Sequence, residues 1–145
     1  MTESTHLLAI AKKAGLLQIG ADSVTQAAER GKARLILAAA DASDRSVRGA
    51  QAAAEAANVP CVRLPDTMEE LGSLVGRGTP GILAVTDIGL ASAFLKKLNA
   101  ELPDRYGEEA ALLEKRAARA AQRKRAAGGR KAGRTDAGEK GRNEE

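Results

Sequence analysis

The spacing of apolar residues along the first hundred positions switches between two patterns. From Leu7 to Ala14, apolar residues recur three and four positions apart, and Gly15 ends the run. Residues with this spacing share one face of a helix. Residues 35–40 and 82–86 are instead short continuous apolar runs, which are typical of strands covered on both faces. The pattern therefore predicts helices that alternate with short strands.

Capping residues set the bounds of these elements. Asp41-Ala42-Ser43 precedes an alanine-rich segment, Thr67 and Glu70 have the spacing of a capping box, and Asp87 precedes a last helical pattern. We expect helices at residues 7–14, 22–30, 41–57, 67–75 and 87–98, and strands at residues 16–19, 35–40, 61–64 and 82–86. This alternation is typical of an α/β protein, and we expect a single three-layer α/β/α sandwich with a small mixed sheet. The domain should cover residues 1–102, because Pro103 and Asp104 precede a change in composition.

Charge is distributed unevenly between the two parts of the chain. Residues 1–102 contain 11 Lys and Arg and 11 Asp and Glu, whereas residues 103–145 contain 12 and 8. The net charge of +4 therefore belongs to the C-terminal part, and residues 115–134 include no acidic residue. We expect a neutral domain followed by a basic low-complexity tail at residues 103–145, with helical propensity at 107–127 and disorder at 128–145.

Few residues could support catalysis or hold a metal ion. The chain has one histidine, His6, and one cysteine, Cys61, so the sequence offers no zinc cluster and no intrachain disulfide. The glycine-rich stretch at residues 76–81 lacks the Lys-Ser/Thr ending of a phosphate-binding loop and leads into a strand. We therefore expect a protein that is not an enzyme and that needs no cofactor or metal.

The sequence also indicates in which cellular compartment the protein is expected. The first residues lack the basic-then-apolar layout of a signal peptide, and no apolar stretch approaches the roughly 18 residues of a membrane-spanning helix. We expect a cytoplasmic protein that does not associate with membranes.

Two features of the chain favour nucleic acid as the partner. The first feature is a pair of loops. Gly20–Ser23 would place backbone N–H groups at a helix start, and Arg77–Thr79 lies on another loop. The tail forms the second, because its cations could contact a phosphate backbone without sequence preference. These cations are Lys115, Arg116, Arg119, Arg123, Lys124, Arg125, Arg130 and Lys131. A solubilising extension with no specific partner is an equally open interpretation of the tail.

Residues 19–38, which begin Ile19-Gly20-Ala21-Asp22 and end Leu35-Ile36-Leu37-Ala38, resemble the signature of the kink-turn-binding ribosomal protein superfamily (L-seven-Ae / L-thirty-e like). The similarity continues through Asp41-Ala42-Ser43, Asn58-Val59-Pro60, Glu70-Leu71-Gly72 and Ala84-Val85-Thr86-Asp87, and it covers about residues 5–100. Residues 8–15 and 85–91 look closest to the bacterial YlxQ-like branch, whose members are small cytoplasmic proteins regarded as ribosome-related or RNA-binding. The resemblance implies the same α/β/α sandwich.

The resemblance also implies an RNA-binding surface. Its helix start and Gln26 would face base edges, its cations would meet phosphates, and Val75 with the small loop residues would pack against an unstacked nucleotide. The full set is Gly20, Ala21, Asp22, Ser23, Gln26, Lys32, Arg34, Val75, Arg77, Gly78 and Thr79.

The chain departs from the family pattern at the residues that read bases. Kink-turn binders have Asn-Glu and a following Lys where this chain has Asp22, Ser23 and Gln26. Ser23 offers no carboxylate to a guanine edge and Gln26 carries no positive charge. The loss of such a contact typically costs about 1–3 kcal/mol, which the basic tail could offset with affinity that is independent of sequence.

Three hypotheses of function follow. In the first, the protein is a monomeric, ribosome-associated protein that binds structured RNA, either a kink-turn or ribosomal RNA, without catalysis. In the second, the same fold is a protein-interaction or scaffold module whose basic tail binds nucleic acid non-specifically. In the third, it is the substrate-recognition part of an RNA-modifying enzyme, although no catalytic domain follows in the sequence.

Overall fold

The computed structural model describes residues 3–76 and 78–133, and the side chains within these ranges up to residue 127. Over the described residues, six helices and four short strands follow one another. The helices are α1 (Glu3–Lys13), α2 (Ala21–Glu29), α3 (Asp44–Ala57), α4 (Met68–Val75), α5 (Ile88–Glu101) and α6 (Gly107–Gly133), and the strands are β1 (Leu17–Ile19), β2 (Leu35–Ala38), β3 (Cys61–Arg63) and β4 (Ile82–Val85). Every helix and strand that the apolar pattern predicts is present, with bounds that differ by a few residues.

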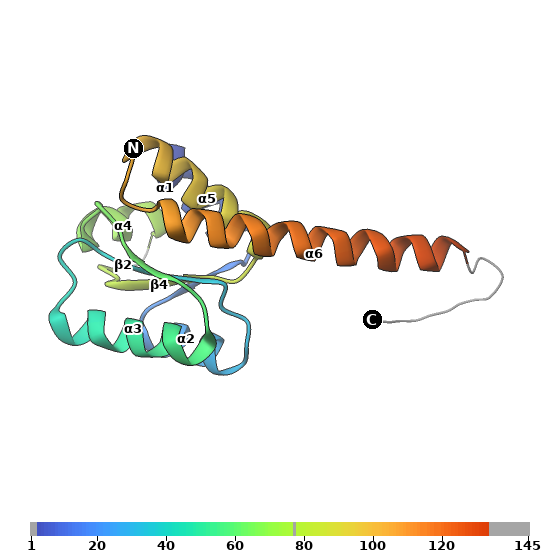
Figure 1. The fold of residues 1–145 in the computed structure, drawn as a ribbon. Coiled ribbons are helices and arrows are strands. Elements are labelled where there is room, and N and C mark those ends of the chain that lie inside the picture. The colour runs from blue at the N-terminus through green and yellow to red at the C-terminus, as the bar shows by residue number, and fades with distance from the viewer. Residues whose placement is uncertain (1–2, 77, 134–145) are drawn as a thin grey trace.

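The four strands form one mixed sheet in the order β1-β4-β2-β3. β2 and β3 are parallel, with Leu37 opposite Val62, whereas β4 is antiparallel to both β1 and β2. The carboxyl ends of β1, β2 and β3 therefore meet the start of β4 at one end of the sheet, which we call the loop end. The other end, with residues 32–34, 58–60 and 86–87, we call the α6 end, because α6 projects beyond it (Figure 1).

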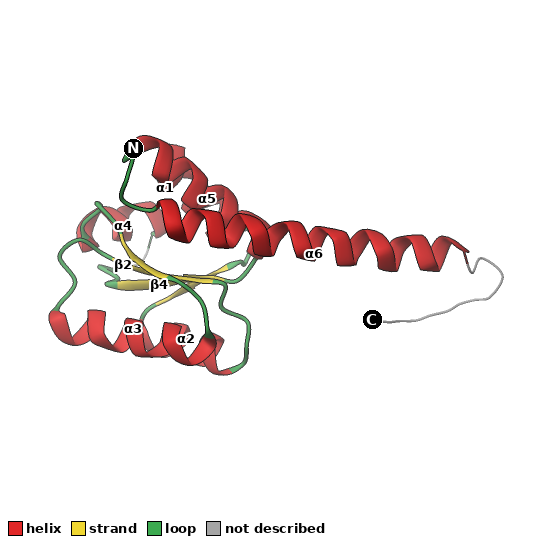
Figure 2. Cartoon of the chain, in the orientation of Figure 1, coloured by secondary structure: helices red, strands yellow, loops and turns green. Residues whose placement is uncertain are grey.

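Side chains of the two central strands alternate between the two faces of the sheet. Leu35 and Leu37 of β2 belong to a core cluster with α1, α4, α5 and α6, whereas Ile36 belongs to a second cluster with α2 and α3. The helices thus form one layer on each face (Figure 2). This arrangement confirms the expected three-layer α/β/α sandwich.

Side-chain caps begin three of the helices, and the caps at Thr67 and Asp87 are at the expected positions, whereas α3 begins three residues later than expected with Ser43 as its cap. Ser43 Oγ accepts a hydrogen bond from Ser46 N (3.1 Å), and Asp87 Oδ2 accepts one from Leu90 N (2.9 Å). Thr67 Oγ1 accepts from Glu70 N (3.1 Å), and Glu70 Oε1 accepts from Thr67 N (2.8 Å), which completes the capping box. These bonds pair N–H groups that a helix start would otherwise leave without partners.

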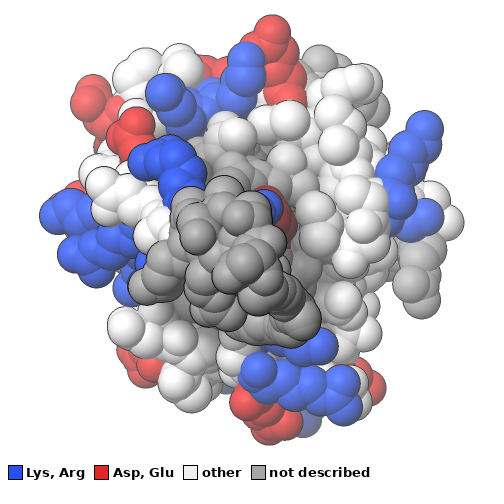
Figure 3. Space-filling view, turned by 90° about the vertical axis from the view of Figure 1, so that its right-hand side faces the viewer, with Lys and Arg blue, Asp and Glu red and all other residues white. Residues whose placement is uncertain are grey.

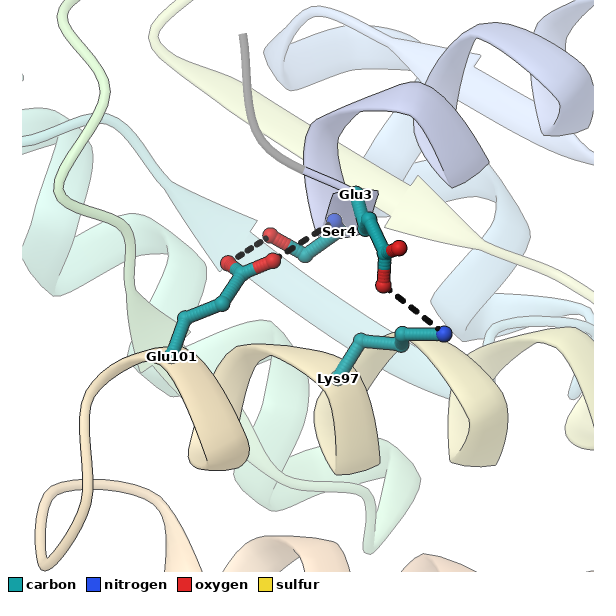
Figure 4. A network of polar contacts seen from close by, with 4 residues as sticks. All are labelled: Glu3, Ser4, Lys97 and Glu101. Carbon is teal, nitrogen blue, oxygen red and sulfur yellow. Dashed lines mark hydrogen bonds and ion pairs between the residues drawn. The ribbon is translucent and has the colours of Figure 1, made fainter.

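Polar contacts join the start of α1 to the end of α5 (Figure 4). Glu101 accepts hydrogen bonds from the amide (3.1 Å) and the hydroxyl (2.7 Å) of Ser4, and Lys97 Nζ lies 2.9 Å from Glu3 Oε1. The hydrogen bond from Lys97 lowers the pKa of Glu3 below its ordinary value. A carboxylate at a helix start also suits the partial positive charge of the first turn.

The packed unit continues past Leu102, where we expected the domain to end. Tyr106 and Leu113 are 3% and 0% exposed and belong to the same core cluster as Phe94 of α5. The Tyr106 hydroxyl also donates a 2.6 Å hydrogen bond to the carbonyl oxygen of Arg63. The first turns of α6 are therefore part of the domain. The helix runs to Gly133, beyond the expected limit of 127, and residues 134–145 lie outside the described residues.

Candidate functional site

Helix α2 starts at a glycine that leaves its first turn without a side-chain cap. Gly20 has a φ of 95°, in the region that only glycine adopts readily, and no side chain accepts a hydrogen bond at this cap. The Gly20 amide donates to the carbonyl oxygen of Ile82 (3.0 Å), which fixes the helix start beside the beginning of β4. Ala21 and Asp22 are exposed and Ser23 is half-buried. The first turn therefore presents backbone N–H groups and two polar side chains to the surroundings.

The loop before β4 lies at the same end of the sheet. Gly76 ends α4 in a left-handed conformation (φ 71°), and the loop folds back so that a Cβ at Gly72 would overlap the carbonyl oxygen of Gly78. Gly78 and Thr79 are both exposed. The fold thus brings the residues from Gly20 to Ser23 and the described part of this loop to one end of the sheet. Arg77 lies outside the described residues.

One residue of the expected surface is not at the surface. Val75 is 1% exposed and belongs to the core cluster beneath α4, so it cannot pack against a nucleotide as expected. The reason is helical spacing, because Val75 follows the buried Leu71 by four positions and continues its apolar face. The expected contact of Val75 with RNA is therefore wrong.

A groove of about 300 Å³ brings together three of the expected residues. Ser23, Gln26 and Lys32 line it from α2 and the turn after α2. Gln18 of the edge strand β1 and Arg30 line it as well, and the sequence reasoning missed both. Two signals in the sequence could have revealed them. Arg30 follows Gln26 by one helical turn, and Gln18 is a polar residue within an apolar strand.

Arg34 lies apart from this groove. Gly31 (φ 71°) reverses the chain after α2, and the Arg34 amide then donates to the carbonyl oxygen of Val85 (2.8 Å) at the start of β2. The Arg34 side chain lines a different cavity, also about 300 Å³, together with Arg116, Arg119 and Arg123 of α6. Lys32 and Arg34, both expected to contact phosphates, therefore lie on two different surfaces.

The remaining cations of α6 fall into two groups. Lys115, Lys124 and Arg125 are exposed and do not line the cavity. Arg130 and Lys131 lie within α6, but among the residues whose side chains the structure does not describe.

Acidic, histidine and cysteine side chains are dispersed over the described part of the chain. No group of three or more of them there could hold a metal ion. Cys61 is half-buried, and burial raises the pKa of its thiol, which lowers its reactivity because the thiolate is the reactive form. No described helix is long and apolar enough to cross a membrane.

Comparisons with known proteins identify the fold. The model of the ribosomal protein L7Ae/L30e/S12e/Gadd45 family matches residues 2–94. A protein of unknown function from Bacillus halodurans has a similar structure, with a TM-score of 0.63 and 19% identity over 68% of this chain and 99% of its own. The Giardia lamblia 15.5kD RNA binding protein gives a TM-score of 0.54 and 20% identity over 66% of this chain and 84% of its own. The sequence has no match among curated proteins.

Proposed function

Since the chain belongs to the ribosomal protein L7Ae/L30e/S12e/Gadd45 family, we propose that it binds structured RNA, of the kink-turn or ribosomal kind, with the start of α2 and the groove beside it. The observation that carries this proposal is the uncapped helix start at Gly20 next to a polar groove. The Giardia protein of similar fold is itself an RNA binding protein, which supports the same class of ligand.

The geometry suits a nucleic acid in two ways. The N–H groups of the first turn of α2 form a site for a phosphate or a base edge, because a helix start carries partial positive charge. Ser23 and Gln26 can both donate and accept hydrogen bonds, as base edges require. Arg30 and Lys32 supply positive charge at the other end of the groove, where phosphates would lie.

The loop at Gly76–Thr79 contributes shape to this surface. Small residues at Gly78 and Thr79 leave room beside the helix start for an extruded nucleotide, and RNA recognition depends largely on such unstacked positions. The carbonyl group of Gly78 lies so close to Gly72 of α4 that a Cβ at residue 72 would overlap it, so a side chain there would displace the loop.

Three residues depart from the family pattern, and they define how specific the binding should be. Asp22, Ser23 and Gln26 provide fewer charge-assisted contacts than the Asn-Glu and Lys of kink-turn binders. We propose that recognition uses the bent shape of the RNA more than the identity of single bases. The triple substitution Asp22→Asn, Ser23→Glu and Gln26→Lys should therefore increase the preference for a kink-turn.

The experiment that tests the proposal measures the anisotropy of a labelled kink-turn RNA and of a plain duplex with the full-length protein. We expect tighter binding of the kink-turn. Gln26→Glu places a negative charge in the groove and should weaken kink-turn binding by about tenfold. Gln51→Glu makes the same change at an exposed position of α3 outside the groove, and it serves as the matched control.

The outcomes separate the hypotheses. Equal affinity for both RNAs, unchanged by Gln26→Glu, would contradict the proposal and favour a scaffold module. The full chain is needed, because a chain that ends at Leu102 would lose the buried side chains of Tyr106 and Leu113.

Association with the ribosome is a finer part of the proposal. We propose a cytoplasmic monomer that binds ribosomal RNA or its precursors. Sedimentation of a cell extract through a gradient tests this, because the protein should travel with ribosomal particles at low salt and leave them as salt is raised. Presence in the light fractions at every salt concentration would contradict it.

A further inference from the structure

The cavity at the α6 end of the sheet has an unusual lining. Three of its arginines, Arg116, Arg119 and Arg123, are spaced by three and four residues on α6 and so share one face of this helix. Arg34, directly before β2, and the segment from Ala57 to Val59, directly before β3, line the cavity as well. Figure 3 views this end of the molecule and shows blue Lys and Arg side chains around its rim, with red Asp and Glu side chains among them.

Among the residues that the structure describes, the arginines of this cavity have no acidic partner. No Asp or Glu is among its described lining residues, and neither ion pair of the described chain involves a lining arginine. Asp87 precedes the lining residue Ile88, but its carboxylate caps α5. Four like charges around one hollow repel each other. An anionic ligand would remove this repulsion.

The guanidinium groups keep most of their donors available. Arg116 donates to the carbonyl oxygen of Asn58 (2.8 Å), and Arg34 donates to that of Gly31 (3.1 Å). Each guanidinium has five N–H donors, so these bonds orient the two side chains and leave four donors on each. Arg116 is also only half-exposed. Half of the arginine set is therefore held in place by backbone carbonyl groups.

We propose that this arginine cleft, formed by Arg34, Arg116, Arg119 and Arg123, binds the phosphodiester backbone of an RNA. The inference rests on the proposed function for the identity of its ligand, but it uses a surface separate from the α2 groove. The α2 groove lies beside the edge strand β1, whereas the cleft lies beside the start of β2 and the turn before β3. The cleft supplies affinity that does not depend on sequence, and the groove supplies the preference for shape.

A polymer fits this surface better than a single small anion. Arg116 and Arg123 are seven residues apart, which is about 10 Å along a helix, and the exposed cations Lys124 and Arg125 continue the positive charge beyond the cleft. Arginine suits this ligand because its planar fork matches the geometry of phosphate oxygens. The tail is then no independent flexible binder, because its first arginines act together with Arg34 of the domain.

The test measures binding of the kink-turn RNA and the duplex to the full-length protein across salt concentrations. Arg119→Gln and Arg34→Gln should each lower the affinity for both RNAs about 3- to 10-fold. Each should also reduce the steepness of the plot of log affinity against log salt concentration by about one. Arg48→Gln removes the same charge from an exposed position of α3 outside the cleft, and we expect a change of less than about twofold. Thermal melting of each variant checks that the fold is intact.

Arg34→Gln is the decisive variant, because Arg34 lies directly before β2 and not on α6. If Arg119→Gln lowers RNA affinity and Arg34→Gln does not, the proposal that the cleft binds RNA is wrong. The cations of α6 would then bind RNA without Arg34. If Arg119→Gln and Arg34→Gln both behave like Arg48→Gln while the kink-turn preference persists, the cleft does not bind RNA and the proposed function stands. If the unmodified protein binds neither RNA, the proposed function itself fails.

A titration with inorganic phosphate distinguishes the source of the phosphate group. Amide resonances near Arg34 and Arg119 should move little with millimolar phosphate and strongly with RNA. Strong shifts with phosphate, combined with RNA affinity unchanged in both cleft variants, would overturn the proposal in favour of a small-anion site.

Discussion

The two faces of the sheet are covered by very different side chains. The face with α1, α4, α5 and α6 buries large residues, among them Leu8, Leu71, Phe94 and Leu113. The face with α2 and α3 is built mainly from alanine, with Val24, Ile36 and Ile82 as its larger members. Both faces are buried, but the side chains of the first face are larger and each buries more apolar surface.

This difference separates stability from function. Hydrophobic stabilisation grows with buried apolar area, at about 25 cal/mol per Å², so the face with Phe94 should contribute most of the folding free energy. Helix α2, which carries the candidate groove, lies on the alanine-rich face. Small side chains let α2 lie close to the sheet, while the weaker packing makes it easier to open locally. We expect binding changes on one face to be separable from stability changes on the other.

The largest expected effect is the removal of the phenyl ring at the centre of the first face. Phe94 is 1% exposed, and Phe94→Ala should lower the free energy of unfolding by about 3–5 kcal/mol, because the cavity left behind cannot fully collapse. Urea denaturation followed by circular dichroism measures this. A loss below about 1 kcal/mol would contradict the comparison, since the face with Phe94 would then not contribute most of the folding free energy.

The next effect tests whether α6 belongs to that face. Leu113 is 0% exposed and Leu112, its neighbour in sequence, is 38% exposed. Leu113→Ala should therefore cost about 2–5 kcal/mol, whereas Leu112→Ala should cost less than about 1 kcal/mol. The same denaturation experiment compares the two variants. Equal losses would show that α6 does not pack on the domain as described.

The same pair of leucines shows where the sequence stops being informative. Residues 107–127 consist mainly of Ala, Glu, Lys and Arg, so propensity predicts a helix but not its docking. Two adjacent leucines lie about 100° apart around a helix, and nothing local decides which of them turns inward. The domain boundary expected at Leu102 fails for this reason, because burial of Leu113 and Tyr106 depends on contacts with distant elements.

Other parts of the fold were predictable because their causes are local. The capping box of Thr67 and Glu70 and the cap at Asp87 need only neighbouring residues, and continuous apolar runs mark β2 and β4 on their own. The local sequence pattern does not predict the strand order or the antiparallel placement of β4. The pairing of Leu37 with Leu83 joins residues that are distant in sequence.

The candidate site also combines features with local causes and features that depend on distant contacts. The helix start at Gly20 and the spacing of Ser23 and Gln26 follow from local patterns, and the structure places Ser23 and Gln26 in one groove with Lys32. Arg34 is only two residues after Lys32, yet it lines the cleft with Arg119 of α6. That division depends on the turn at Gly31 and on where α6 docks, neither of which the sequence pattern reveals.

A smaller effect is expected on the alanine-rich face. Val24 is 1% exposed, and Val24→Ala should lower the free energy of unfolding by about 1–2 kcal/mol, because it removes two methyl groups but gains some helix propensity. Thr25→Ala, at the exposed neighbouring position, should stay within about 0.5 kcal/mol of the unmodified protein.

Hydrogen exchange gives this variant a second measurement. Amides of α2 and α3 should exchange faster than those of α5 in the unmodified protein, and Val24→Ala should widen that gap. If α5 exchanges as fast as α2, the two faces have equal local stability and the comparison is wrong.

The smallest effect is electrostatic and concerns Asp66, in the turn between β3 and α4. Burial raises the pKa of its carboxyl, and the negative charges of Glu70 and Glu101 raise it further. Its Oδ1 atom is buried without a hydrogen-bond partner. The native state therefore holds this proton more tightly than the unfolded chain, in which the pKa is about 3.9.

The sign of the pH dependence follows from this difference in proton binding. The favourable contribution of protonated Asp66 is complete below about pH 4. It is lost as the pH rises through the raised native pKa. Asp66→Asn removes the ionisation, so the free energy of unfolding of this variant, relative to the unmodified protein, should increase between about pH 4 and pH 7. We expect a change below about 1 kcal/mol, because the carboxyl is partly exposed to solvent. Urea denaturation at a series of pH values measures it, and a difference that stays constant or falls over this range would contradict the role assigned to Asp66.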